Sequence, residues 1–168
     1  MKKRDLEILI RKTYLDLQKK YGLHEYALLP AYDGKKGRKN TGLYYHLRLL
    51  KNHAWQGRRY DYDDYGHKEE QIFEYEVKFT ALSDNPEHNP NDIASQALMI
   101  VQSLPFIETL SKSDVGLQRV NQLRSMPFIN DSDNYEEEVF FTFNLSVVQT
   151  INPPTPSVDT FNVKIHKV

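Results

Sequence analysis

The stretch IFEYEVKFTAL, residues 72–82, decides the fold because its side chains alternate between apolar and polar. A period of two places apolar residues on one face of a strand and polar residues on the other. We therefore predict a strand that is buried on one face only. The core face is expected to hold Phe73, Tyr75, Val77, Phe79 and Ala81, and the outer face Glu74, Glu76, Lys78 and Thr80.

The residues after this strand predict a turn and then a helix. SDNPEHNPND, residues 83–92, is rich in turn-forming residues, and Asn91 is suited to cap a helix N-terminus. The helix is predicted over residues 92–104, with Pro105 just past its end. Its apolar stripe consists of Ile93, Ala97, Ile100, Val101 and Leu104.

The other segments supply a second helix and further strands. Residues 4–21 carry apolar residues at helical spacing and end at Gly22. Alternation predicts strands over GLYYHLRLLKN (42–52) and VFFTFNLSVVQ (139–149), and VGLQRVNQLRSM (115–126) is expected to contain a further short strand. The predicted fold is α+β: a single domain, residues 1–168, with a mainly antiparallel sheet and two helices packed on it.

Three segments are predicted outside this framework. Long polar loops are expected at about 30–42 and 52–70. The proline-rich run NPPTPSV favours extended, stiff backbone, and residues 158–168 after it alternate again. This C-terminal strand could return to its own sheet or pair with another subunit. The sequence leaves both open, and the return within the chain is slightly favoured.

Composition excludes several classes of protein. The net charge is −1, whereas tight nonspecific binding of nucleic acid needs a positive excess. The chain has no cysteine, so disulfide scaffolds, thiolate metal sites and cysteine nucleophiles are excluded. No apolar run reaches the roughly 20 residues of a membrane span, and charges interrupt the N-terminal apolar stretch too early for a secretory signal. We therefore expect a cytoplasm-like compartment and no membrane partner.

The acidic run DYDDYGHKEE, residues 61–70, invites a calcium-loop interpretation that fails. An EF-hand starting at Asp61 needs an oxygen ligand at position 5 and a bidentate glutamate at position 12. Tyr65 and Ile72 occupy those positions. The run is therefore interpreted as a solvated loop, and no metal site is predicted. His53 and His67 bracket the run and could meet over its aspartates, although no spacing requires it.

No catalytic motif is present either. The chain lacks HExxH and G-x-S-x-G, and GKKGRKNTG (34–42) has neither the spacing nor the following helix of a phosphate-binding loop. Acidic runs such as EEE (136–138) are usually solvated. We predict a protein that is not an enzyme, with no catalytic residues and no cofactor. A metal-dependent nuclease using Asp63 is the enzymatic alternative.

The order of these segments resembles the neck or tail terminator proteins of long-tailed bacteriophages. The resemblance rests on four segments and spans roughly residues 4–166: a strand and turn (72–82), a helix (92–104), the VGLQRVNQLRSMP block (115–127) and an acidic strand (135–148). It implies a structural virion protein that forms a ring, usually a hexamer, at the head-proximal end of the tail. Such a ring ends tail-tube polymerisation and joins tail to head.

The resemblance also implies partners: other copies of the chain, the tail-tube protein, a head-completion or neck protein and, as a further candidate, the tail sheath. DNA would pass through the ring without specific binding. The particle is expected to be assembled in the host cytoplasm, and the protein to reside in the neck or tail of the virion. The alternatives are another neck or tail-tube structural protein (a head-completion protein or adaptor) and a small monomeric binding module.

Within this interpretation, two regions are candidate subunit interfaces. The first combines aromatic and basic anchor residues, which interface hot spots favour, with acids that could pair with the basic loop of a neighbour. It comprises Trp55, Arg58, Arg59, Tyr60, Asp61, Tyr62, Asp63, Asp64 and Tyr65, with Arg38 and Lys39 as the basic partners. The second is the C-terminal strand, with Phe161, Val163 and Ile165.

Overall fold

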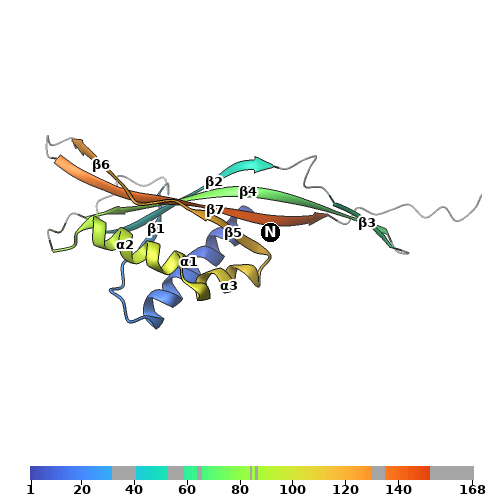
Figure 1. Cartoon of the computed structure of the whole chain (residues 1–168), viewed down its shortest axis with the longest axis horizontal. Coiled ribbons are helices and arrows are strands. Elements are labelled where there is room, and N and C mark those ends of the chain that lie inside the picture. Colours follow the sequence, from blue (N-terminus) through green and yellow to red (C-terminus); the bar gives the residue numbers. More distant parts are fainter. Residues whose placement is uncertain are drawn as a thin grey trace, which may run out of the picture.

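The computed structural model describes residues 1–31, 41–52, 59–63, 66–83, 85, 87–129 and 135–151. This part of the chain forms two layers, a twisted sheet and a layer of helices that covers one of its faces (Figure 1). The helices are α1 (Lys3–Lys20), α2 (Pro90–Val101) and α3 (Leu104–Ser111). The strands are β1 (Leu28–Pro30), β2 (Gly42–Asn52), β3 (Arg59–Asp63), β4 (Gly66–Leu82), β5 (Val115–Val120), β6 (Arg124–Ile129) and β7 (Tyr135–Ile151).

The long antiparallel pair β4 and β7 forms the backbone of the sheet. The pair runs in unbroken register from Glu69 opposite Ile151 to Ala81 opposite Val139. On the outer side of β4, β2 and then β3 pair with successive parts of the strand; on the outer side of β7, β5 and β6 do the same. β1 lies beside β2 and is parallel to it. Both central strands therefore extend beyond the region that the helices cover.

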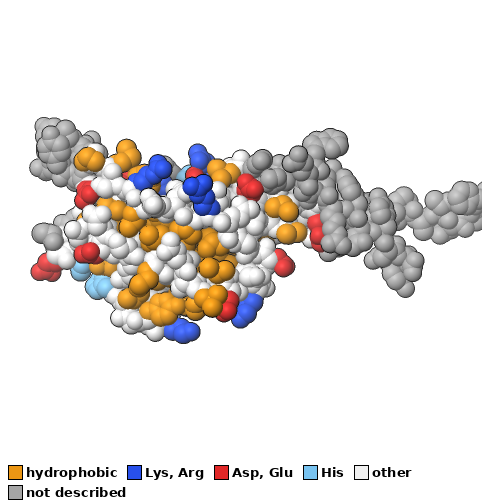
Figure 2. Space-filling model, in the orientation of Figure 1, with side chains coloured by type: hydrophobic (Ala, Val, Ile, Leu, Met, Phe, Trp, Pro, Cys, Tyr) orange, Lys and Arg blue, Asp and Glu red, His pale blue; other side chains and the backbone are white. Residues whose placement is uncertain are grey.

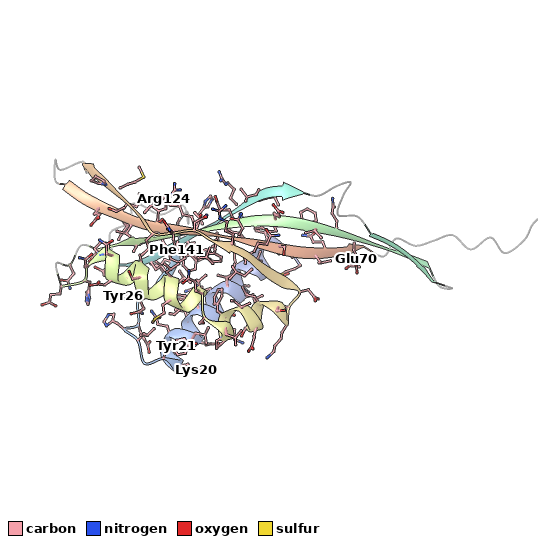
Figure 3. The ribbon with its side chains drawn as sticks, viewed as in Figure 1. Lys20, Tyr21, Tyr26, Glu70, Arg124 and Phe141 are labelled. Atoms are coloured by element: carbon pink, nitrogen blue, oxygen red, sulfur yellow. The ribbon has the colours of Figure 1, made fainter. Side chains whose placement is uncertain are left out.

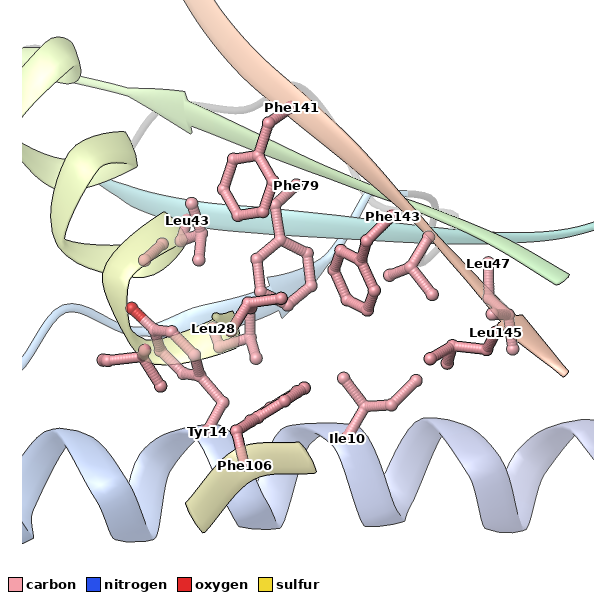
Figure 4. Packing of buried hydrophobic residues seen from close by; sticks show 14 of the residues in the cluster. Ile10, Tyr14, Leu28, Leu43, Leu47, Phe79, Phe106, Phe141, Phe143 and Leu145 are labelled. Carbon is pink, nitrogen blue, oxygen red and sulfur yellow. The ribbon is translucent and has the colours of Figure 1, made fainter. Parts of the chain in front are cut away.

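The core lies between the sheet and the helices and follows the predicted alternation (Figure 4). Phe79 is at its centre, with ring centroids 5.2 Å from Phe143 and 5.6 Å from Phe141 in edge-to-face contacts. From the helix layer, Tyr14 approaches Phe79 edge-on at 5.8 Å, and Phe106 approaches Phe143 at 6.4 Å. Such contacts stabilise a core beyond the burial of apolar area alone.

The structure confirms the α+β class, the single domain and most predicted elements. The strand predicted over 72–82 is part of β4, with Tyr75, Val77, Phe79 and Ala81 buried. The strands predicted over 42–52 and 139–149 are β2 and part of β7, and the first predicted helix is α1. α1 ends where expected, because Gly22 adopts a positive φ of 61° that glycine accepts without strain.

The prediction of two helices was wrong, because a third one follows directly. α2 ends at Val101, and α3 begins at Leu104. Pro105 was expected to lie past a helix end. It instead occupies the first turn of α3, where its missing N–H is not needed and its fixed φ suits a helix. Considered singly, none of the described helices is long and apolar enough to cross a membrane; α2 and α3 pass that test only as a pair bent by 54°.

The predicted N-cap and the predicted short strand also need correction. The N-cap of α2 is Asn89, whose side-chain oxygen accepts a 2.8 Å hydrogen bond from the backbone N–H of Asn91. Pro90 then fills the first helical position. Residues 115–126 contribute to two strands, β5 and β6, which both pair with β7. In the connection between these strands, the backbone N–H of Asn121 donates a hydrogen bond to the carbonyl of Thr142 in β7 and so keeps the connection beside β7.

The predicted loop over 52–70 is largely a β-hairpin. β3 ends at Asp63 and β4 begins at Gly66, so only two residues separate the strands. The register places Asp61 opposite Lys68 and Arg59 opposite Glu70, and opposite charges at facing positions favour an antiparallel pair. The pattern was missed because these strands are polar on both sides. The loop predicted over 30–42 overlaps two strands at its ends, because β1 ends at Pro30 and β2 begins at Gly42. Positions 32–40 lie outside the described residues.

Candidate assembly surfaces

A narrow ribbon extends from the body of the domain, and we call it the distal arm. It consists of β3, the first part of β4 (66–72) and the end of β7 (148–151). Figure 1 shows the arm continuing past the helix layer, and Figure 3 shows Glu70 out along it. Among the described elements, no helix covers either face of the arm.

The arm brings together five of the residues predicted for the first interface. Arg59, Tyr60, Asp61, Tyr62 and Asp63 form β3 itself. The backbone register pairs these five residues with positions 66–70 of β4, so they lie along one margin of the arm.

The remaining candidates lie outside the described residues. These are Trp55, Arg58, Asp64, Tyr65, Arg38, Lys39, Phe161, Val163 and Ile165, and His53 lies there as well. Their proposed contacts remain predictions.

Both margins of the arm are edges of the sheet. In the described part of the chain, β3 pairs with β4 alone, and β7 beyond Val147 has β4 as its one neighbour. An edge strand presents unpaired N–H and C=O groups that can pair with another chain. Apolar side chains at the base of the arm are exposed as well: Leu49, Ile72 and Val148. The distal arm therefore has the features of a surface for strand-to-strand association.

The sequence analysis missed these exposed apolar residues. The alternation of β2 put Leu49 on the core face, and the structure also places it on that side, but half of its surface is exposed because no helix extends so far. Ile72 and Val148 face each other across β4 and β7. The signal available in the sequence was that each of these two residues stands between polar residues on its face of the strand: Ile72 between Glu70 and Glu74, and Val148 between Ser146 and Thr150.

In the described part of the chain, no element covers the face of the sheet away from the helices, and this face carries charges of both signs. Arg48 pairs with Glu76 at 2.7 Å, and Lys78 pairs with Glu138 at 2.9 Å while lying 3.9 Å from the ring centre of Phe140. Figure 2 shows basic side chains beside acidic ones along this side. Each of these ion pairs joins facing positions of neighbouring strands and so stabilises the sheet. Because each pair is neutral, the two pairs do not create a strong electrostatic field of one sign on this face.

A shallow hollow of about 220 Å³ lies on this face where β5 passes into β6. Its lining includes Glu76, Asn121, Arg124 and Thr142, and Figure 3 shows Arg124 on the uncovered side of the sheet. The one carboxylate there is already bound to Arg48. A single paired carboxylate is insufficient for acid–base catalysis and for metal binding, because each needs several suitably placed groups. Among the described residues, no group of three or more His, Asp or Glu is placed to hold a metal ion.

The second protruding element is the acidic hairpin, formed by β6 and residues 135–140 of β7. It extends at the opposite end from the distal arm (Figure 1). Glu136, Glu137 and Glu138 follow one another in β7, opposite Phe128, Pro127 and Met126. Met126 is 57% exposed, and Glu137 is exposed although it accepts hydrogen bonds from Ser125 and Asn91. The sequence analysis treated this acidic run as merely solvated.

The described residues thus form a small two-layer body with protruding β-elements at both ends and free sheet edges, and no catalytic constellation is found among them. The comparison with protein families is specific. The chain belongs to the family of the E217 gateway protein gp29, whose family model matches residues 5–157. A search of curated proteins found no match.

The family makes this chain a phage gateway protein, a structural head–tail connector of the virion neck. Proteins of this type assemble as rings in the neck and are generally not enzymes. The predicted resemblance to phage neck proteins is confirmed at this level. The narrower assignment to tail terminators is not, and the alternative of another neck structural protein describes the family better.

Proposed function

We propose that copies of this chain close into a ring, a hexamer, that joins the phage head to the tail and lets DNA pass through its centre. The observation that carries the proposal is the extent of the family match. Residues 5–157 include the helix-covered body, the distal arm and the acidic hairpin, so the matched region contains every surface described above.

The arrangement of surfaces suits a closed ring. Rings are built from head-to-tail contacts, in which one surface of a subunit meets a different surface of the next. The distal arm and the acidic hairpin lie at opposite ends of the domain, so the two can serve different contacts of one subunit (Figure 1). The net charge of −1 agrees with a channel that DNA crosses without being held.

The partners that we propose are those of a neck component. One face of the ring would meet a head-completion or neck protein and the other the tail-tube protein, with the sheath as a further neighbour. A second candidate role is termination of tail-tube growth. It is favoured by the order of β4, α2, β5, β6 and β7, which follows the order of segments that resembles terminators.

Electron microscopy of particles produced without this protein separates the two roles. We expect DNA-filled heads and tails of normal length that are not joined. Over-long tail tubes would assign termination to the chain. Normal, joined and infectious particles would overturn both roles.

The part played by the distal arm is tested by charge reversal. Changing Asp61, Asp63 and Asp64 to Lys should abolish the ring in light scattering, because repulsion would replace attraction at each contact. The matched control changes three exposed acids of the body, Glu25, Glu87 and Glu108, to Lys. A ring that survives reversal in the arm would remove these acids from the interface.

A further inference from the structure

The connection between β5 and β6 forms a groove at one edge of the sheet, and we call it the arginine groove. It is lined by residues 119–124, and its volume is about 450 Å³. Asn121, Gln122 and Arg124 also line the shallow hollow on the uncovered face, so the two depressions adjoin. In the described part of the chain, β5 and β6 pair with β7 and with no other strand. The backbone on the outer side of the groove therefore has no strand partner there.

A bulge in β5 decides which face of the sheet carries Arg119. The strand has one extra residue after Leu117, so the residue opposite Asn144 of β7 is Arg119. In a regular strand Gln118 would occupy that position, and Arg119 would face the core. Asn144 alternates with the core residues of β7, so it lies on the uncovered face together with Arg119. Bulges commonly re-aim a side chain in this way beside functional sites.

A second extra residue brings Arg124 to the same face. Three residues of the connection, 121–123, span a stretch in which β7 has two, 141 and 142. Asn121 fixes the connection, because its backbone N–H and its side-chain amide donate hydrogen bonds to Thr142 at 2.8 and 2.6 Å. Arg124 lies opposite Phe140, and Figure 3 shows it on the uncovered side of the sheet. The two arginines are therefore on one face, four positions or about 13 Å apart along β7.

Both arginines of the groove are unneutralised. They are exposed, and among the described residues neither makes an ion pair. The carboxylate in the lining of the adjoining hollow, Glu76, is bound to Arg48 at 2.7 Å. The groove thus presents two free guanidinium groups. Guanidinium is the side-chain cation best suited to bind a carboxylate or a phosphate, because it can donate two parallel hydrogen bonds.

The surroundings of the groove favour an acidic protein segment over DNA. Nucleic acid is bound through a run of phosphates, which requires a surface of predominantly positive charge. Glu76 and Glu138 lie on the same face as the two arginines, each in an ion pair, so this surface is of mixed sign. An extended peptide can carry carboxylates at two positions only, and its backbone can pair with a free strand edge. Charge and edge together therefore select a peptide segment.

We propose that the arginine groove is the docking site for an extended acidic segment of a neighbouring virion protein. The segment adds as a strand along the edge formed by β5 and β6, with one carboxylate against Arg119 and another against Arg124. Alternate residues of a strand share a face, so the two acids should be four positions apart, as in Glu-x-x-x-Glu. The proposal deepens the proposed function and rests on it for the partner, since a neck component has other virion proteins on both of its faces.

Peptide binding to the purified protein tests the groove. The probe is a fluorescein-labelled peptide, TETVTET, whose glutamates are four positions apart in a sequence that favours extended backbone. It should bind saturably in fluorescence polarisation. The peptide TETVETT has the same composition and charge but carries its glutamates on opposite faces, so it should bind roughly fivefold more weakly through the loss of one ion pair. A labelled trithymidylate, which carries two phosphates, should bind no better than TETVETT.

Variants of the two arginines identify them as the contacts. Arg119→Glu with Arg124→Glu should weaken the binding of TETVTET by roughly tenfold or more, because reversal turns attraction into repulsion. Arg119→Lys with Arg124→Lys keeps the charge and the fold but loses the paired hydrogen bonds, so it should weaken binding severalfold. The control, Arg11→Glu with Lys19→Glu, makes the same change in net charge at exposed positions of α1 and should bind like the wild type.

Three results would overturn the docking site: no binding of TETVTET, equal binding of the two peptides, or binding that survives charge reversal. Tighter binding of the trithymidylate would also overturn it, since the groove would then be a phosphate site.

The same variants test the groove in the phage. Charge reversal at Arg119 and Arg124 should leave the ring intact but heads and tails unjoined, whereas the α1 control should give infectious particles. Infectious particles from the reversed variant would refute the groove as a docking site and leave the proposed function untouched. The proposed function would instead fail if particles made without the protein were joined and infectious, and this outcome is independent of the peptide measurements.

Discussion

Replacing Tyr14 by Phe should stabilise the fold, and the structure supplies the magnitude. Tyr14 is fully buried, with its ring edge-on to Phe79 at 5.8 Å, yet its hydroxyl has no hydrogen-bond partner among the described residues. An unpaired buried hydroxyl costs about 1–3 kcal/mol. Phe keeps the ring contact and removes the hydroxyl, so we expect a gain of about 1 kcal/mol in the free energy of unfolding.

The same change should alter the response to alkaline pH. Burial, and to a lesser extent the neighbouring Tyr26, raises the pKa of Tyr14 above its ordinary value. The folded state therefore favours the neutral phenol. The stability that this gives is fully present below the unfolded pKa of about 10 and is lost as the pH rises above it, by up to about 1.4 kcal/mol per pH unit. The Phe variant lacks this loss.

Urea unfolding of wild type and Tyr14→Phe at pH 7, 9 and 11 measures both effects. The stability difference should be about 1 kcal/mol at pH 7 and should widen between pH 9 and 11. Tyr14→Ala is the control for a core position and should lose about 3–5 kcal/mol. A Phe variant less stable than wild type by about 1 kcal/mol would show that the hydroxyl is paired. A difference that stays constant up to pH 11 would show that folding does not raise the pKa of Tyr14, and either result would refute the reasoning.

Three further predictions address the local structure. Asn89→Ala should destabilise the domain by about 1 kcal/mol and Asn91→Ala by less than about half of that, because Asn89 is the N-cap of α2. Equal losses in thermal unfolding would contradict the assignment of Asn89 as the cap. Gly116→Ala should destabilise, since a Cβ there would lie 2.6 Å from Ser146 Oγ, and Ser146→Ala should relieve most of the loss in a double-mutant cycle. Deleting residues 158–168 should leave a folded monomer if the segment pairs between subunits. An unfolded product in circular dichroism would place it in its own sheet.

The alternation of apolar and polar residues predicted the helix-covered body of the fold well, because a sheet that is buried on one face requires this regular pattern in its strands. Phe79, Phe141 and Phe143 all lie in the core as expected from their spacing. The third helix was missed because LPFIETLS is short and has a proline as its second residue, and proline also follows many helices. The local sequence there is compatible with either outcome.

The assembly surfaces were only partly predictable, because they depend on which strands pair. β3 is polar on both sides, so its pairing with β4 is visible from the register and not from hydrophobic periodicity. Met126 is exposed because its register opposite Glu138 puts it on the face of the sheet away from the helices, and that register is not visible in the sequence.

The mass of the purified protein in solution tests the central claim most directly. Sedimentation equilibrium should give a closed ring of six copies of the 19.8 kDa chain, or single chains that assemble into such a ring when tail or neck components are added. A stable dimer, or a chain that stays single even with those components present, would contradict the account.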